Sequence, residues 1–147
     1  MDNNKLSGSI PDSFGSFQNP ITLDLHANRL SGPIPSSLGQ VNAYLMDFSG
    51  NDLVGDPSFL FGKNKRFALT INLSNNRFEF DFSEVELPTG LRDLNVSHNR
   101  VYGSLPKQLA QLPLRSIDVS HNQLCGPIPT GRRLKRFSPI YFSHNKR

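Results

Sequence analysis

The sequence predicts a solenoid of stacked repeats, with a parallel β-sheet on its concave face and short 3₁₀ or β turns on its convex face. An asparagine recurs at positions 4, 28, 51, 76, 99, 122 and 145, in steps of 23 to 25 residues. The phrase that follows it also recurs, as NKLSGSIP at 4–11, NRLSGPIP at 28–35, NRVYGSLP at 99–106 and NQLCGPIP at 122–129. A period of about 20 to 50 residues is typical of repeat architectures, in which stacked neighbours complete one core.

Each repeat after the first opens with the pattern of a half-buried strand. Two apolar residues stand five and three positions before the asparagine, and a spacing of two places both on one face of a strand. The pairs are Leu23/Leu25, Met46/Phe48, Ile71/Leu73, Leu94/Val96, Ile117/Val119 and Ile140/Phe142. We therefore expect six strands in one parallel sheet.

The asparagine is expected to end each strand and to turn its side chain inward. Stacked repeats would align these amides as a ladder, where each amide must find hydrogen-bond partners. The glycine that follows permits a turn and the proline ends strand pairing. A second apolar cluster, such as Leu38 or Leu109 with Leu112, should form the outer wall.

Two repeats depart from this pattern. At 51–58 the Ile-Pro pair is replaced by Asp56-Pro57, and the basic loop GKNKR follows at 62–66. At 76–83, Phe78, Phe80 and Phe82 alternate with acidic residues. That alternation predicts a strand with three aromatic rings on one face.

The repeats resemble the plant-specific leucine-rich repeat, LxLxxNxLxGxIPxxLxxLxxL, over essentially the whole chain. The stretches GDPSFLFGKNKR, LSNNRFEFDFSEVELP and NQLCGPIPTGRRLKRF, which include the irregular repeats, are similar to the C-terminal portion of plant polygalacturonase-inhibiting proteins. The resemblance implies a leucine-rich repeat solenoid with no enzymatic activity and no cofactor. It also implies a protein of the plant cell wall that acts in defence by binding fungal or insect polygalacturonases.

The resemblance further implies a single domain, residues 1–147, of about six repeats that is truncated at both ends and lacks its caps. We expect the uncapped ends to fray or to associate end to end. In the family, the cysteine of the LCG phrase pairs with a second one after the last His-Asn. Cys125 is the one cysteine here, so we expect a free, buried thiol.

The expected partner-binding surface is the set of strand residues that face away from the core. They form three columns, which lie six, four and two residues before each asparagine and match the family's target-binding positions. This surface is polar and net acidic, which suits a basic or hydrogen-bonding protein partner. The first column gives Thr22, Thr70 and Asp93; the second gives Asp24, Asp47, Asn72, Asn95 and Asp118; the third gives His26, Ser49, Ser74, Ser97 and Ser120.

Several apparent chemical motifs are explained by the repeat. Ser97-His98, Ser120-His121 and Ser143-His144 resemble nucleophile and base pairs, but they recur because the repeat recurs. Adjacent strand residues also point to opposite faces, so we expect no catalytic site. No cysteine or carboxylate set at ligand spacing accompanies the histidines, so we expect no metal site.

Basic residues gather in two places. The residues are Lys63, Lys65 and Arg66 in one loop, and Arg132, Arg133, Lys135 and Arg136 near the end of the chain. The resemblance implies that they could bind pectin, a polyanion. Aromatic residues for base stacking are scarce beside them, so nucleic-acid binding is not expected. Two sequons, at Asn72 and Asn95, are candidate glycosylation sites.

Composition and charge set further bounds. The net charge of +4 is uneven, because residues 1–118 hold 10 Lys/Arg against 12 Asp/Glu, whereas residues 119–147 hold six Lys/Arg and no acid. With 19 Leu and 11 Phe the chain is not typical of disorder. No stretch approaches the roughly 18 apolar residues of a membrane span. Residues 1–20 lack the apolar run of a signal peptide, so extracellular location rests on the resemblance.

Two alternatives stay open. An ice-binding (antifreeze) protein resembles the same family, but ice binding favours a flat, regular array of Thr or Asn, and the second column mixes Asp and Asn. The other alternative is a fragment of a receptor-like ectodomain that binds a peptide or a co-receptor. The Phe-rich repeat and the LCGPIPTGRRLKRF ending favour the inhibitor family.

Overall fold

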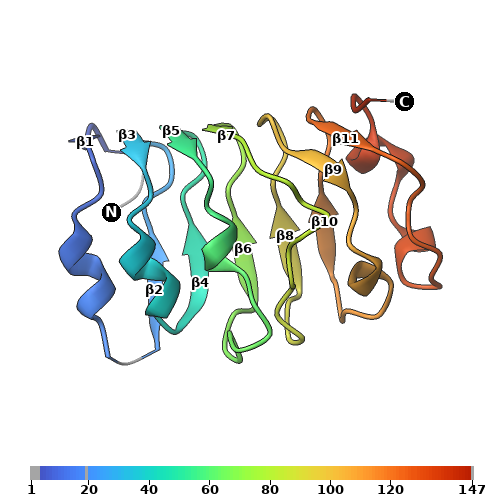
Figure 1. Cartoon of the computed structure of the whole chain (residues 1–147), viewed down its shortest axis with the longest axis horizontal. Coiled ribbons are helices and arrows are strands. Elements are labelled where there is room, and N and C mark those ends of the chain that lie inside the picture. The colour runs from blue at the N-terminus through green and yellow to red at the C-terminus, as the bar shows by residue number, and fades with distance from the viewer. Residues whose placement is uncertain (1–3, 19, 147) are drawn as a thin grey trace.

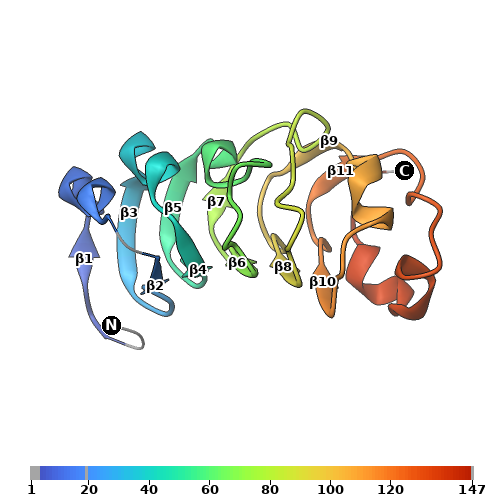
Figure 2. The ribbon, with the colours of Figure 1, turned by 90° about the horizontal axis from the view of Figure 1, so that it is seen from below.

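The computed structural model, which describes residues 4–18 and 20–146, confirms the predicted solenoid. Its repeats stack in a single row from the N-terminal to the C-terminal repeat (Figure 1). Five strands form one parallel sheet in the order β2 (Ile21–Asp24), β4 (Ala43–Asp47), β6 (Thr70–Asn72), β8 (Asp93–Asn95) and β10 (Ser116–Asp118). Figure 2 shows this sheet along the inner side of a shallow arc, so it is the concave sheet.

A second short strand follows each strand of the concave sheet. β1 (Ser7–Gly8), β3 (Arg29–Pro33), β5 (Asp52–Gly55) and β7 (Arg77–Phe78) form one parallel sheet, and β9 (Tyr102–Ser104) pairs with β11 (Gln123–Cys125). The 3₁₀ helices are η1 (Asp12–Ser16), η2 (Ser36–Gln40), η3 (Ser58–Leu60), η4 (Lys107–Ala110), η5 (Leu134–Arg136) and η6 (Pro139–Phe142). The prolines that precede η1, η2 and η4 have φ between −66° and −57°, close to the value fixed by the pyrrolidine ring.

The hydrophobic core runs through the row of repeats as one continuous cluster. The apolar strand pairs from Leu23/Leu25 to Ile117/Val119 are at most 7% exposed, as their spacing of two predicted. The outer-wall residues Leu38, Leu109 and Leu112 are buried as well, which confirms the second apolar cluster. None of the helices in the described ranges is long and apolar enough to cross a bilayer.

The asparagine ladder is confirmed, and the ladder asparagines are Asn28, Asn51, Asn76, Asn99, Asn122 and Asn145. In a typical step, the Asn99 Nδ2 donates to the carbonyls of Leu73 (2.9 Å), Val96 (3.2 Å) and Ser97 (3.1 Å). Its Oδ1 accepts from the Phe78 N–H at 2.9 Å. Each amide therefore ties its own turn to the preceding repeat, because it bonds backbone groups of both.

The last repeat differs from the prediction of a sixth strand at 139–143. The chain forms the 3₁₀ helix η6 instead, and Ile140 is 62% exposed. Pro139 at the first helical position brings a fixed φ and no N–H, which suits a helix start better than a ladder. The Ser138 hydroxyl also accepts from the Ile140 N–H. Neighbouring backbone bonds persist nevertheless, since the Val119 N–H donates to the Tyr141 carbonyl at 2.9 Å.

The Phe-rich repeat is extended over a shorter length than predicted. β7 covers only Arg77–Phe78, and Asp81 forms an isolated bridge with Tyr102. The three rings are nevertheless all buried, at no more than 2% exposed. Phe80 and Phe82 both pack against Phe61, with ring centroids 6.3 and 6.1 Å from it. Burial of these rings followed from the alternation, whereas the short strand pairing did not.

Cys125 is a free thiol, as expected, but the prediction that it is buried is wrong. It lies in β11 next to Leu124, which is buried, so the alternation of the strand turns the Cys125 side chain outward. Its Sγ lies 3.4 Å from the Gly103 carbonyl of the adjacent strand β9.

Candidate partner-binding face

The predicted columns lie side by side on the concave sheet because the strands pair in parallel register. Asp24 stands opposite Asp47, and Asp47 opposite Asn72. The same alignment continues from Asn72 through Asn95 to Asp118. The second column is therefore a straight row of partly buried carboxylates and amides. The three columns of β2, β4, β6, β8 and β10 contain no Lys or Arg, so the face is acidic.

The first column is the most accessible of the three. Thr22 and Ser116 are exposed, while Leu45, Thr70 and Asp93 are partly buried. Asp93 accepts a hydrogen bond from the Ser116 hydroxyl at 2.7 Å, which links β8 to β10 across the face. These residues and the outer atoms of the second column form the surface that a partner would meet.

The third column lies mostly inside the fold. Ser74, Ser97 and Ser120 are 3–5% exposed. Their hydroxyls donate to Oδ1 of the second-column residue two positions earlier, at 2.7–2.8 Å, and Ser49 does the same to Asp47 at 2.6 Å. The same Oδ1 atoms accept the serine backbone N–H groups. These serines hold the second-column side chains in place. Because the serines are largely buried, the second column offers more surface to a partner than the third column does.

His26 occupies the serine position of its repeat and contacts two carboxylates of the concave sheet. Its Nδ1 lies 2.6 Å from Asp24 Oδ1. Burial raises the pKa of the Asp24 carboxyl. Its hydrogen bonds to His26 and the positive charge of that ring together lower this pKa by more than burial raises it, so the pKa lies below its usual value. Ligand atoms of Asp24, His26 and Asp47 lie within 4.8 Å of one another. The expectation that no carboxylate set surrounds a histidine is therefore wrong here, since strand register brings Asp47 close.

The other three histidines form a stack along one edge of the solenoid. His98, His121 and His144 directly precede ladder asparagines, with φ of 54–56°. Neighbouring ring centroids are 4.1 Å apart and the planes differ by 12° and 7°. Their serine neighbours Ser97 and Ser120 donate to Asn95 and Asp118, away from the imidazoles. These two Ser-His pairs are thus not arranged as nucleophile and base. In the third pair the Ser143 hydroxyl lies 2.8 Å from the His144 Nδ1 and donates to the Ile140 carbonyl at 2.7 Å.

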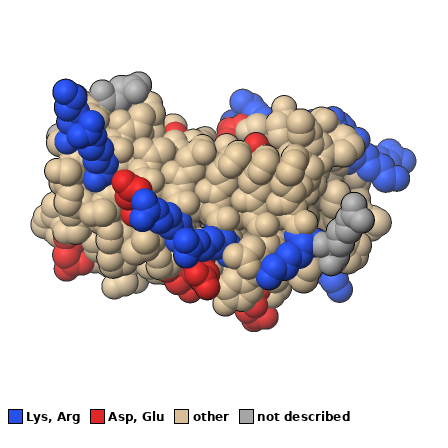
Figure 3. Space-filling model, turned by 90° about the horizontal axis from the view of Figure 1, so that it is seen from above, with Lys and Arg blue, Asp and Glu red and all other residues tan. Residues whose placement is uncertain are grey.

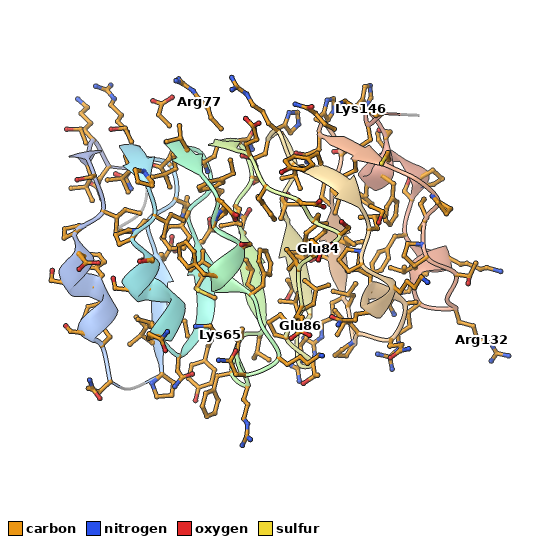
Figure 4. The ribbon with its side chains drawn as sticks, viewed as in Figure 1. Lys65, Arg77, Glu84, Glu86, Arg132 and Lys146 are labelled. Carbon is orange, nitrogen blue, oxygen red and sulfur yellow. The ribbon has the colours of Figure 1, made fainter. Side chains whose placement is uncertain are left out.

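The first basic patch loses one member, whereas the four members of the second patch are all exposed. Lys65 is 4% exposed and its Nζ donates to the carbonyls of Gly39 and Val41, so its assignment to a polyanion-binding surface is wrong. Lys63 pairs with Glu86 at 2.7 Å, and Figure 4 shows Lys65 and Glu86 toward the same edge of the molecule. Arg133 donates to the Leu112 carbonyl and Arg136 to that of Leu114. Both arginines nevertheless stay exposed, as do Arg66, Arg132 and Lys135.

A row of cations on the opposite edge was missed by the sequence reasoning. It consists of five of the seven residues directly after the repeated asparagines, the other two being Asp52 and Gln123, and Figure 3 shows an acidic residue interrupting the row. Arg77 bonds that residue, Asp52, at 2.5 Å. The exposed cations of the row are Lys5, Arg29, Arg77, Arg100 and Lys146. The signal for this row is present in the sequence, because a Lys or Arg directly follows five of the seven repeated asparagines.

The two sequons lie on the concave face, as predicted. Asn72 and Asn95 are both partly buried in the second column. The Asn72 Nδ2, the atom to which a glycan would be attached, donates to Asp47 Oδ2 at 3.0 Å. Glycosylation of these asparagines stays a prediction.

Comparison with protein families matches residues 1–17, 19–41, 90–112 and 113–131 to the model described as Leucine Rich Repeat. Among curated proteins, the chain is 45% identical over 107 residues to a polygalacturonase inhibitor of Pyrus communis, which covers 73% of the chain and 32% of that protein. It is 48% identical over 101 residues to polygalacturonase inhibitor 1 of Arabidopsis thaliana, which covers 69% of the chain and 30% of that protein. The chain thus spans about a third of these relatives.

Among solved structures, the chain is similar to a plant ice-binding protein. The TM-score is 0.93 at 43% sequence identity, over 97% of this chain and 46% of that one.

Proposed function

Because the chain belongs to the leucine-rich repeat family, we propose that it is a protein-binding module that inhibits polygalacturonases through its concave sheet. The observation that carries the proposal is the 45–48% identity to curated polygalacturonase inhibitors over about seven-tenths of the chain. The proposal places the protein outside the cell, at the plant cell wall, and assigns it no chemistry of its own.

Charge complementarity supports the concave sheet as the contact surface. An enzyme that cleaves a polyuronate must present positive charge where it binds the carboxylates of its substrate. The concave columns carry Asp24, Asp47, Asp93 and Asp118 and no Lys or Arg. Such a face would sit over the substrate cleft or its rim and exclude the polymer.

Inhibition kinetics with binding measurements test the proposal. Fungal and insect polygalacturonases are assayed for release of reducing ends from polygalacturonic acid, with and without the chain, and binding is measured by calorimetry. We expect lower turnover and an affinity that weakens as salt is raised, since exposed charges are screened. The proposal is lost if no enzyme of the panel is bound or inhibited.

The exposed cations support pectin as a second contact. Arg66, Arg132 and Lys135 are accessible, as is the edge row that includes Arg77 and Lys146. Retention on immobilised polygalacturonate that is lost at about 0.5 M salt, where screening acts within about 4 Å, would agree with this contact. Equal retention on an uncharged polysaccharide would contradict it.

Ice binding is the alternative that the similarity to the plant ice-binding protein favours. The second column mixes three aspartates with two asparagines, and Oδ1 atoms of the column accept serine hydroxyls within the fold, so the array is irregular and we expect no thermal hysteresis from the concave face. Thermal hysteresis or inhibition of ice recrystallisation, together with no effect on polygalacturonases, would decide for the alternative.

A further inference from the structure

An exposed aromatic pair lies at the edge of the concave sheet. Tyr44 and Phe67 are 45% and 41% exposed, whereas Phe48, Phe78 and Phe82 are fully buried. The rings of the pair are 5.6 Å apart with an interplanar angle of 69°, an edge-to-face contact. Two large rings held together in water keep apolar area available for a partner to bury.

A β-bulge places Tyr44 on the surface. Residues Ile21 and Thr22 of β2 are consecutive, yet they pair with Ala43 and Leu45 of β4. Tyr44 is therefore the extra residue of β4, between Ala43, which is buried, and Leu45 on the concave face. Bulges commonly re-aim a side chain at functional sites. The Tyr44 side chain thus faces neither the core nor the middle of the concave face, and lies at the edge of the concave sheet.

The loop at 62–66 fixes Phe67 beside Tyr44. Lys65 is buried in this loop, and its Nζ donates to the Gly39 and Val41 carbonyls of the preceding repeat. On the other side of Phe67, the Leu69 N–H donates to the Tyr44 carbonyl at 3.1 Å. The chain is therefore held on both sides of Phe67, and the two rings contact each other, so we expect little conformational entropy to be lost on binding.

We propose that Tyr44 and Phe67 form the apolar anchor of the partner interface, over which a polygalacturonase places an apolar side chain flanked by cationic ones. This inference rests on the proposed function. Buried aromatic anchors commonly carry most of the binding energy of an interface. Asp24 and Asp47 are the only charged residues of β2 and β4, and Asp47 lies three residues along the strand, roughly 10 Å from Tyr44. The anchor and these carboxylates therefore set the chemistry of the partner.

The test compares Tyr44→Ala, Phe67→Ala and the double variant with Tyr102→Ala. Tyr102 is a matched control, since it is 42% exposed and lies in β9, outside the concave sheet. Affinity for a polygalacturonase that binds the unchanged chain is measured by calorimetry. We expect each single anchor variant to bind at least tenfold more weakly than the unchanged chain. The double variant should lose less affinity than the product of the two single fold losses, because the rings contact each other. The affinity of Tyr102→Ala should stay within about twofold of the unchanged chain.

Further measurements separate the possible failures. Circular dichroism and thermal unfolding check that each variant folds, and Phe67→Tyr, which keeps the ring, should retain affinity. If the unchanged chain binds the enzyme and both anchor variants bind equally well, the anchor is refuted while the proposed function stands. If the unchanged chain binds no polygalacturonase, both proposals fall. A loss confined to oligogalacturonide binding would overturn the protein anchor in favour of sugar stacking.

Discussion

At the scale of single residues, the ladder asparagines connect each repeat to the one before it through side-chain hydrogen bonds. Asn99 satisfies three carbonyls and one N–H with a single amide. No described side chain leaves a buried nitrogen or oxygen without a hydrogen-bond partner. Because an unsatisfied buried group is more costly than a formed hydrogen bond is favourable, loss of one amide should be felt in two repeats.

Replacing Asn99 by Ala is expected to lower the free energy of unfolding by about 2–4 kcal/mol, because several backbone groups lose their partner at once. Urea unfolding followed by circular dichroism measures the change. Asn42→Ala is the control, since Asn42 is exposed and outside the ladder. Equal effects of the two substitutions would show that the ladder amide contributes nothing special.

The histidine stack predicts a pH dependence of stability. Desolvation and the repulsion from His144 and His98 lower the pKa of His121, and Asp118 opposes them only partly. A folded-state pKa below the unfolded value of about 6.5 means that stability is present above pH 6.5 and is lost as the pH falls through the folded value. The urea midpoint should therefore decrease between pH 7.5 and 5.

His121→Asn should reduce this slope without straining the backbone. Asn75 occupies the equivalent position of another repeat with φ of 54°, the same as that of His121, and asparagine tolerates this left-handed conformation. An unchanged slope of the urea midpoint against pH would contradict a role of the stack.

Cys125 should react in the folded protein. Its side chain is exposed in β11, so Ellman's reagent is expected to titrate one thiol under native conditions at a rate close to that in urea. A reaction that requires unfolding would show that the thiol is protected after all.

At the scale of elements, local patterns predicted the concave sheet well and the special elements poorly. The strands from β2 to β10 follow from apolar residues at a spacing of two. Two local signals indicate the departures from the repeat pattern. Pro139 favours a helix start over a sixth strand, and Cys125 follows the inward-facing Leu124.

Other features depend on contacts across repeats. Lys65 is buried because carbonyls of the preceding repeat accept hydrogen bonds from its ammonium group. These carbonyls lie 24 and 26 residues earlier in the sequence, so the sequence of the loop alone does not predict the contact. The approach of Asp47 to His26 depends likewise on strand register. The serines of the third column were predicted to face a partner, but Ser74, Ser97 and Ser120 turn inward, because Asp or Asn two residues earlier accepts their hydroxyls.

Lys65 should matter more to stability than its neighbour Lys63. Lys65→Met leaves the Gly39 and Val41 carbonyls without their donor and is expected to cost about 1–3 kcal/mol. Lys63→Met breaks an exposed ion pair with Glu86 and should cost less than about 1 kcal/mol. Urea unfolding of both variants side by side decides, and a larger loss for Lys63→Met would contradict the assignment.

At the scale of the whole molecule, stacking creates both the stability and the surface. Each repeat contacts its neighbours through the concave sheet, the core and the ladder, so stability is shared between adjacent repeats. The same register aligns Asp24, Asp47, Asn72, Asn95 and Asp118 in one row. A substitution on one strand of the concave sheet can therefore obstruct a partner while the other strands stay folded.

The most direct test of the account is inhibition of a polygalacturonase by the unchanged chain and by two arginine variants. Thr70→Arg adds bulk and positive charge to β6, the central strand of the concave sheet, whereas Ser31→Arg adds the same group to an exposed position of β3 in the second sheet. If the concave sheet is the contact surface, the unchanged chain and Ser31→Arg inhibit alike and Thr70→Arg inhibits at least tenfold more weakly. Inhibition that Thr70→Arg leaves intact, or that Ser31→Arg abolishes, would contradict binding through the concave sheet.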